Sequence, residues 1–268
     1  MKEKTAFDVT NMPYESNPFK LLNPTFEAFG IMATEFLKLL GISILVYLVV
    51  AIPAIIGLIS MSSSKSSPAG IGLLVLSVVL FVPVVIYLSY AFVKIGLAAA
   101  RGQALPWRMA LPKKYADAWG LFWTTLLASF IIGLGFIALI VPGLFFMLWY
   151  SQVQFLVVDE GLTGMAALSR SKMLVRSRLM DIFGLYGMNQ LVGIVSNVPI
   201  LGSLASIIYT IVTIPLMPIR YIQLTQLSDE DRVKIPTNKW NYLALVFGVI
   251  AVIALVVLSA YSASTSQS

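Results

Sequence analysis

The sequence predicts an all-α polytopic transmembrane helix bundle with about seven spans. Hydrophobic residues make up 59% of the 268 residues and charged residues only 11%, whereas soluble domains are roughly 45–50% apolar and about 25% charged. The charged residues are confined to short stretches, since none occurs at 118–158, at 182–219 or after Lys239. A soluble fold of this size could not bury so much apolar surface, so a water-soluble enzyme and a disordered chain are both excluded.

Each uncharged run predicts one or two spans, because a helix needs about 20 apolar residues to cross the hydrocarbon core. The run 118–158 would form a straight helix about twice as long as the bilayer is thick, so it must turn back. We expect this turn at Pro142-Gly143, since proline removes a backbone donor and glycine tolerates unusual dihedral angles. The run 182–219 must turn as well, across 196–199 or 201–203, and a re-entrant hairpin is the alternative to two full spans. The predicted spans are 39–59, 71–93, 118–140, 144–158, 182–198, 204–221 and 240–261.

Lysine and arginine predict the orientation of the bundle. Of the 18 basic residues, only Lys65 falls on one side of the predicted membrane, and all the others fall on the opposite side. Basic residues are enriched in cytoplasmic loops. We therefore expect a multi-pass protein of a bacterial cytoplasmic (inner) membrane, with a cytoplasmic N-terminus and the C-terminus outside.

Three cytoplasmic segments, at 24–40, 105–121 and 163–184, resemble one another faintly, and each leads into a hairpin of spans. They predict a six-helix core of three units, each an interfacial helix plus a hairpin, with a seventh helix appended. In the first segment Asn23 can cap the helix and Pro24 suits its first position. The apolar face of this helix suits either the headgroup plane or packing on neighbouring spans. The predicted divisions are a flexible polar cytoplasmic leader at 1–22, the six-helix membrane domain at 23–227, a cytoplasmic linker at 228–239, and the C-terminal transmembrane helix and tail at 240–268.

The composition also limits the chemistry. The chain has no histidine and no cysteine, which excludes Ser-His-Asp and Cys-His nucleophilic sites, zinc sites with thiolate or imidazole ligands, iron–sulfur clusters and the usual haem ligands. No charged residue falls in the middle of a predicted span. We therefore expect no enzymatic activity, no cofactor and no metal.

Basic residues of the cytoplasmic segments are the candidate contacts for lipids or a partner protein. Anionic headgroups attract each basic residue near the surface by about 1 kcal/mol, and the alternative is that these residues only fix the topology. The charges of the third segment do not form one stripe, and Arg178 can pair with Asp181 at i+3. The cluster is short and held against a membrane, so we expect no nucleic-acid binding. The candidates are Arg101, Arg170, Lys172, Arg176 and Arg178.

Polar side chains within the spans are the second set of candidates, because intramembrane polar residues are by default candidates for a functional site. Amides at these places either line a substrate cavity or form hydrogen bonds between helices. The glycine pairs 133/135 and 184/187 favour close helix packing. The candidate intramembrane polar site consists of Gln152, Gln154, Asn189 and Gln190.

Three short motifs carry a family resemblance: Ile140-Val141-Pro142-Gly143, Val157-Val158-Asp159-Glu160-Gly161 and Ala167-Leu168-Ser169-Arg170-Ser171. Over about 24–223 the chain resembles the glycerophosphoryl diester phosphodiesterase membrane-domain family and related uncharacterised six-helix bacterial membrane proteins. The resemblance implies a six-helix membrane core. Some members carry a separate phosphodiesterase domain, for which this chain has neither the room nor the histidines, and the seventh helix departs from the pattern. The motif residues with an expected structural role are Pro142, Gly143, Asp159, Glu160 and Ser171.

Two functions follow as hypotheses. The first is a non-enzymatic membrane scaffold that interacts with lipids or a partner through basic interfacial helices. The alternative is a transporter or permease-like protein for a small solute or lipid, with a polar site between the fourth and fifth spans. Membrane lipids are the expected partners, together with a second copy of the chain or another membrane protein.

Overall fold

The computed structural model describes residues 8–63, 68–195, 209, 213–243 and 246. Every regular element in these residues is a helix, which confirms the predicted all-α class. Four helical segments of the described chain are long and apolar enough to cross a membrane, as expected of a membrane protein: Pro18–Ser62, Pro68–Ala100, Tyr115–Ala138 and Val141–Glu160. These four segments contain the first four predicted spans almost entirely.

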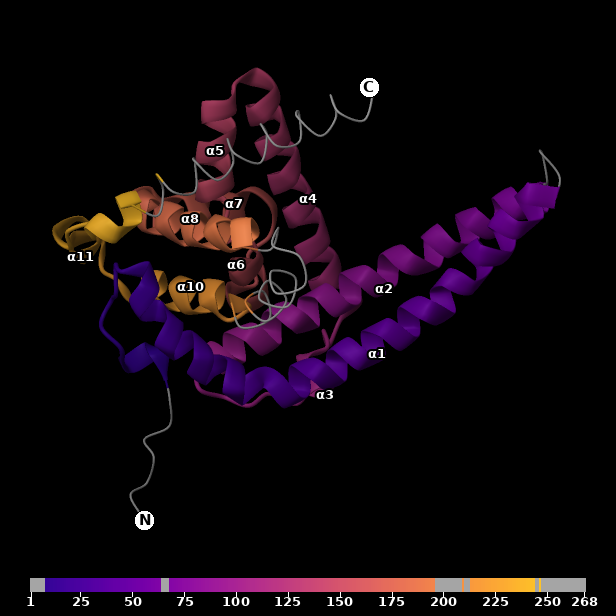
Figure 1. Ribbon diagram of the computed structural model, residues 1–268, viewed down its shortest axis with the longest axis horizontal. Helices are drawn as coiled ribbons and strands as arrows, with labels where there is room; N and C mark the ends of the chain where they lie inside the picture. Colours follow the sequence, from indigo (N-terminus) through magenta and orange to yellow (C-terminus); the bar gives the residue numbers. More distant parts are fainter. Residues whose placement is uncertain (1–7, 64–67, 196–208, 210–212, 244–245, 247–268) are drawn as a thin grey trace, which may run out of the picture.

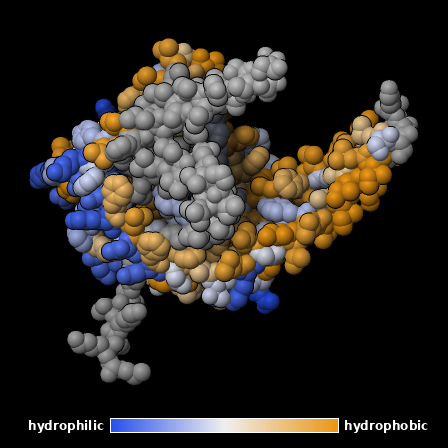
Figure 2. All heavy atoms as spheres, viewed as in Figure 1, coloured by the Kyte–Doolittle hydropathy of each residue, from blue (hydrophilic) through white to orange (hydrophobic). Residues whose placement is uncertain are grey.

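Two long helices form a hairpin that projects from the rest of the molecule. Helices α1 (Leu22–Ser63) and α2 (Pro68–Ala100) lie side by side and antiparallel (Figure 1). Near the tip their backbones approach closely, since a Cβ on Gly57 would lie 2.8 Å from the carbonyl oxygen of Gly70. Figure 2 shows hydrophobic residues covering the visible face of this hairpin. Such an extended apolar surface is suited to lipid rather than water.

Helix α1 differs from the predicted interfacial helix that bends into a span, because it is one continuous helix. Asn23 lies inside it and caps nothing at its start; the chain enters it from a short 3-10 helix, η2 (Pro18–Leu21), which Asn17 caps through Phe19 N–H. The first turns of α1 bury Ala28 and Met32 against the core and leave Phe26 exposed. This burial favours packing on neighbouring helices, the second of the two alternatives for this segment.

The second hairpin turns three residues earlier than predicted. Helix α4 (Tyr115–Ala138) is followed by Leu139, which has an extended backbone, and α5 (Ile140–Trp149) begins at the next residue. Pro142 therefore lies in the first turn of α5, where its missing N–H leaves no hydrogen bond unmade. A Cβ on Gly143 would lie 2.5 Å from the ring of Phe136, so glycine is needed for the close crossing of α4 and α5 rather than for the turn.

The fourth predicted span is also interrupted. A turn at 150–152 separates α5 from α6 (Val153–Glu160), and Gly161 ends α6 in a left-handed conformation with φ 69°. Helix α7 (Gly164–Arg176) follows after a short loop. The regular α-helix is therefore interrupted once at 150–152 and ends at Gly161 before α7 begins.

The remaining elements pack around the ends of the two hairpins. They are η1 (Val9–Asn11), α3 (Trp107–Ala110), α8 (Leu179–Val195), α10 (Leu216–Gln226) and α11 (Asp229–Lys234). We call residues 8–38, 94–123, 150–187 and 213–243 the base. We call the parts of α1 and α2 between Lys38 and Lys94 the first arm, and the parts of α4 and α5 between Thr124 and Trp149 the second arm. Every charged residue of the described chain lies in the base, and Figure 2 shows hydrophilic residues gathered there.

The N-terminal segment from Asp8 to Leu21 differs from the predicted flexible leader, because it is packed into the base. Val9 and Leu21 are fully buried in the main core cluster. The Tyr14 hydroxyl donates to the Asp181 carboxylate of α8 at 2.6 Å. Burial of apolar and polar side chains together fixes this segment against α8 and α10.

Several predictions fall outside the described residues. The turn between the fifth and sixth predicted spans, at 196–203, is one of them, and so is most of the seventh span beyond residue 246. Helices α8 and α10 flank the first of these regions.

Candidate functional site

Helix α7 crosses the second arm at the level where the arm leaves the base. At its start, the backbone N–H of Gly164 donates to the Thr124 hydroxyl of α4 at 2.8 Å. Further along, the buried Ser171 hydroxyl donates to the carbonyl oxygen of Trp149 at the end of α5, at 2.6 Å. The predicted motif residue Ser171 thus joins α7 to the second arm. Because the start of α7 meets α4 and its middle meets the end of α5, the helix passes from one side of the arm to the other.

The two faces of α7 differ in chemistry. The inner face buries Ala167, Leu168, Leu174 and Val175. The outer face exposes Met165 and Met173, at 63% and 59%, together with Lys172 and Arg176. Apolar side chains beside lysine and arginine on one exposed face are typical of helices that lie in the membrane interface.

The basic residues predicted to contact lipids or a partner differ in how far their charges are already engaged within the chain. Lys172 lies over the Trp149 ring, with Nζ 4.3 Å from the centroid, and its residue remains exposed. Arg170 Nε lies 3.7 Å from Glu160, and both side chains are about one-third exposed. Arg176 is exposed. A partly exposed ion pair is worth little, so Arg170, Lys172 and Arg176 remain accessible to a ligand.

Arg101 belongs to a polar cluster that joins three elements of the base. Its Nη2 donates to both carboxylate oxygens of Asp159, at 2.6 and 2.7 Å. The Tyr221 hydroxyl of α10 donates to Asp159 at 3.0 Å and lies 3.4 Å from Glu160. The motif residues Asp159 and Glu160 therefore connect α6 to α2 and α10. Their interactions join three elements of the base to one another.

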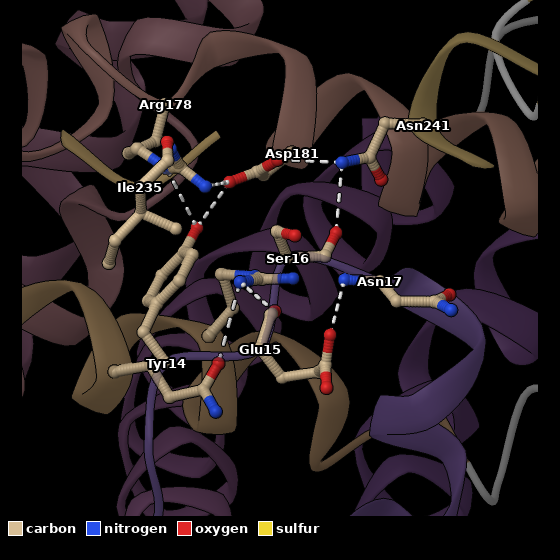
Figure 3. A network of polar contacts seen from close by, with 10 residues as sticks. Tyr14, Glu15, Ser16, Asn17, Arg178, Asp181, Ile235 and Asn241 are labelled. Atoms are coloured by element: carbon tan, nitrogen blue, oxygen red, sulfur yellow. Dashed lines mark hydrogen bonds and ion pairs between the residues drawn. The ribbon is translucent and has the colours of Figure 1, made fainter. Parts of the chain in front are cut away.

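Arg178 lies in the interior, in the network of Figure 3. It forms the i+3 ion pair expected from the sequence, with Nη2 2.5 Å from Asp181, and the two side chains are only 2% and 0% exposed. Arg178 also donates to the carbonyl oxygen of Ile235, and Asn241 Nδ2 donates to Asp181 at 2.6 Å. A buried cation with these partners is not accessible to a headgroup, so Arg178 differs from the other basic candidates.

The same network holds Tyr14 between two guanidinium groups. The Tyr14 ring centroid lies 4.8 Å from Arg178 and 5.0 Å from Arg220. Burial raises the pKa of the Tyr14 hydroxyl to about 12, Arg220 opposes this rise, and Asp181 adds to it. Arg220 is fully buried and donates to the Glu15 carbonyl oxygen at 2.9 Å. These contacts join the N-terminal segment to α8, α10 and the residues before the seventh predicted span.

The predicted intramembrane amides are only partly brought together. Gln154 lines a polar hollow of about 230 Å³ between α4, the α5–α6 turn and α8. Gln152 is fully buried at that turn, where its Nε2 donates to Ser151 and its Oε1 has no hydrogen-bond partner in the described residues. Asn189 and Gln190 are on α8, but their side chains lie outside the described residues. The other polar residues that line the hollow are Thr125, Ser129, Tyr150, Ser151 and Tyr186.

The part of the chain that the structure describes contains no cluster of three carboxylates that could hold a metal ion. Comparisons of the chain with family models, with curated proteins and with solved structures found no match. The resemblance to the phosphodiesterase membrane-domain family therefore remains a prediction from the motifs alone.

Sequence reasoning missed Tyr14, Arg220 and Asn241, which complete the buried network. They are far apart along the chain: Asn241 donates to the Ser16 carbonyl oxygen across 225 positions. The one local signal was Arg220 at the end of an uncharged run. An arginine next to a predicted span is usually explained as one that sets the orientation of the span. That explanation gave no reason to expect Arg220 in the interior.

Proposed function

We propose that this chain is a non-enzymatic, multi-pass membrane protein whose cytoplasmic base binds anionic lipid headgroups through the outer face of α7. One observation carries the proposal: this face presents Lys172 and Arg176 beside the exposed side chains of Met165 and Met173. In such an arrangement the methionines enter the acyl boundary while the cations remain at the phosphates.

The charges of the base support a structural rather than a catalytic role. Asp159, Glu160 and Asp181 each interact with arginine or tyrosine side chains of the base. A carboxylate whose oxygens are engaged by such partners holds the surrounding elements together, which suits a structural role. The proposal therefore assigns the chain a lipid-organising role in a bacterial inner membrane, with the base and N-terminus in the cytoplasm and the C-terminus outside.

The test uses the full chain, purified in detergent and mixed with phosphatidylglycerol and phosphatidylcholine, with retained lipids counted by native mass spectrometry. The variant Lys172→Gln/Arg176→Gln should lose most of the preference for phosphatidylglycerol. At about 1 kcal/mol per basic residue, the loss is roughly 30-fold at most.

The matched control is Lys234→Gln/Lys239→Gln, which removes two exposed lysines elsewhere on the base. This control should keep the preference of the original chain. Equal losses in the two double variants would show that only the overall charge matters, and an unchanged preference in the α7 variant would remove the proposed lipid contact.

A transporter is the second candidate, and the polar hollow beside Gln154 favours it. If solute crosses there, Gln154→Leu/Thr125→Val should abolish flux in liposomes while the thermal unfolding temperature stays close to that of the original chain. Ser169→Leu, on the exposed outer face of α7, is the control and should leave the flux unchanged.

A further inference from the structure

We propose that the second arm does not cross the bilayer: it inserts into the cytoplasmic leaflet and ends among the acyl chains near the bilayer centre. This inference rests on the proposed membrane contact of α7 and adds a second lipid-binding element to the same face. Its ligand is the acyl region of one leaflet, and the binding surface is the apolar hairpin 124–149.

Helix α7 crosses the second arm at the level of the lipid headgroups. Helix α7 contacts Thr124 on one side of the hairpin and Trp149 on the other. At that level it exposes Lys172 and Arg176. Exposed cations are expensive inside hydrocarbon, so this crossing marks the headgroup region. Only the residues between Thr124 and Trp149 are then free to enter the membrane.

The exposed face of α4 changes in composition after Trp123. Tyr115, Trp119 and Trp123 follow one another at intervals of four residues and are exposed, with their rings in contact. After Trp123 the large exposed side chains of this helix include Leu126, Phe130, Leu134 and Ile137, while Thr125 and Ser129 are the exposed polar residues, both within the first two turns. Tyrosine and tryptophan are enriched at the membrane interface, and mainly apolar surface lies beyond it. This change occurs beside Thr124 and therefore agrees with the level set by α7.

The second arm is shorter than the hydrocarbon core is thick. From Thr124 to Ala138 the helix rises about 21 Å, and from Ile140 to Trp149 about 14 Å, at 1.5 Å per residue. The hydrocarbon core is about 30 Å thick. An arm that starts in the headgroups at Thr124 and Trp149 therefore ends inside the bilayer, and any tilt shortens its reach further.

The tip of the second arm is apolar. From Phe130 to Leu148 no side chain contains oxygen or nitrogen, and Ile137 and Leu139 are 83% and 68% exposed. Two backbone N–H groups of the turn are paired within it: Leu139 N–H donates to the Gly135 carbonyl oxygen at 3.0 Å, and Gly143 N–H donates to the Leu139 carbonyl oxygen at 3.3 Å. Hydrocarbon accepts an exposed turn only when its side chains are apolar and its backbone groups are paired. A turn in the far headgroups would have no such requirement.

The absence of cysteine in the sequence allows a direct test with single-cysteine variants in oriented proteoliposomes. The positions are Leu139→Cys at the tip of the second arm, Ile137→Cys as a second tip variant, and Ser62→Cys as the control near the tip of the first arm. A membrane-impermeant maleimide applied to the face opposite the base should label Ser62→Cys. It should not label either tip variant from either face until detergent is added.

A bimane attached at position 139 or 137 should then be quenched most strongly by lipids that carry a nitroxide deep in the acyl chain. Labelling of a tip variant from the same face as Ser62→Cys would overturn the proposal, because the arm would then span. Strongest quenching by a nitroxide near the headgroup would overturn it as well, because the arm would then lie on the surface.

A separate variant, Met173→Cys with the same bimane, distinguishes this inference from the proposed function. Quenching of position 173 by a headgroup-level nitroxide is expected from the lipid contact of α7. If that quenching is absent, the proposed contact of α7 fails, whatever depth the tip of the arm has. If it is present while the tip is labelled from the far face, only the leaflet-inserted arm fails.

Discussion

The two arms are similar in composition and differ in reach. Between Lys38 and Ser63 helix α1 rises about 38 Å, and between Pro68 and Lys94 α2 rises about 39 Å, which is enough to cross the hydrocarbon core. The second arm rises about half as far beyond α7. The first arm ends in the sequence Ser62–Ser67, which contains Lys65, whereas the second ends at Leu139 among apolar residues. An uncharged run therefore does not by itself define a span. An amphipathic helix that packs across the run can hold part of it at the headgroups, and only the rest of the run then enters the hydrocarbon core.

Both arms are held by the same base. Breaking its buried ion pair, Arg178–Asp181, should therefore lower the stability of the chain more than any other substitution considered. Asp181→Asn leaves the Arg178 guanidinium buried without its carboxylate partner, which costs about 3–5 kcal/mol in comparable cases. We expect the thermal unfolding of the full chain to move to a markedly lower temperature. The exposed pair Lys234–Glu230 provides the control, since Glu230→Gln should change stability by less than about 1 kcal/mol. Equal effects of the two substitutions would contradict the role assigned to the interior network.

A charge at each tip should separate the arms. Arginine at the centre of a bilayer costs about 2.5–3.5 kcal/mol on insertion scales. Leu139→Arg should therefore reduce the fraction of correctly inserted protein strongly, while Ser62→Arg should leave it nearly unchanged. The fractions are measured by carbonate extraction of membranes. Equal tolerance at the two tips would indicate that both reach water.

The close crossing near the tip of the second arm should be sensitive to a single methyl group. A Cβ on Gly143 would lie against the Phe136 ring, whereas one on Gly133 would have no atom within 4 Å. Overpacking of this kind costs about 1–3 kcal/mol. Gly143→Ala should lower the unfolding temperature, and Gly133→Ala should preserve or slightly raise it, as measured by differential scanning calorimetry. A lower unfolding temperature for Gly133→Ala alone would contradict the crossing.

The smallest expected effect is on the stability of the folded chain at alkaline pH. It should come from Tyr14, which lies in the part of the fold that we call the base. The pKa of Tyr14 is raised from 10.0 to about 12 in the folded chain, so folding favours the neutral hydroxyl. Its contribution to stability is fully present below pH 10 and is lost as the pH rises through 12. Tyr14→Phe should flatten part of the fall in stability between these pH values. An identical pH profile for the original chain and the variant would show that Tyr14 does not contribute.

The sequence predicted the features that depend on local composition. These are the all-α class, the first four apolar helices, a turn within three residues of its observed position, and the i+3 pairing of Arg178 with Asp181. Each depends on residues close together in the chain. Hydrophobic length and side-chain spacing are therefore sufficient to find them.

The features that it did not predict depend on tertiary contacts. Tyr14, Arg220 and Asn241 meet only when the N-terminal segment packs against α8 and α10. The crossing of α7 over Thr124 and Trp149 likewise has no local pattern, although it determines which basic residues are exposed. Periodicity shows that α7 is amphipathic, but only packing shows which residues face outward.

Electron paramagnetic resonance measures most directly how deep the tips of the two arms lie in the bilayer. Spin labels at Leu139→Cys and Ser62→Cys in the full chain, reconstituted in nanodiscs, report the relative accessibility of oxygen and a nickel complex. The account predicts that the label at position 139 is close to the bilayer centre, with high oxygen and low nickel accessibility, while the label at position 62 is in the far headgroup region. Equal depth parameters at the two tips would contradict the account.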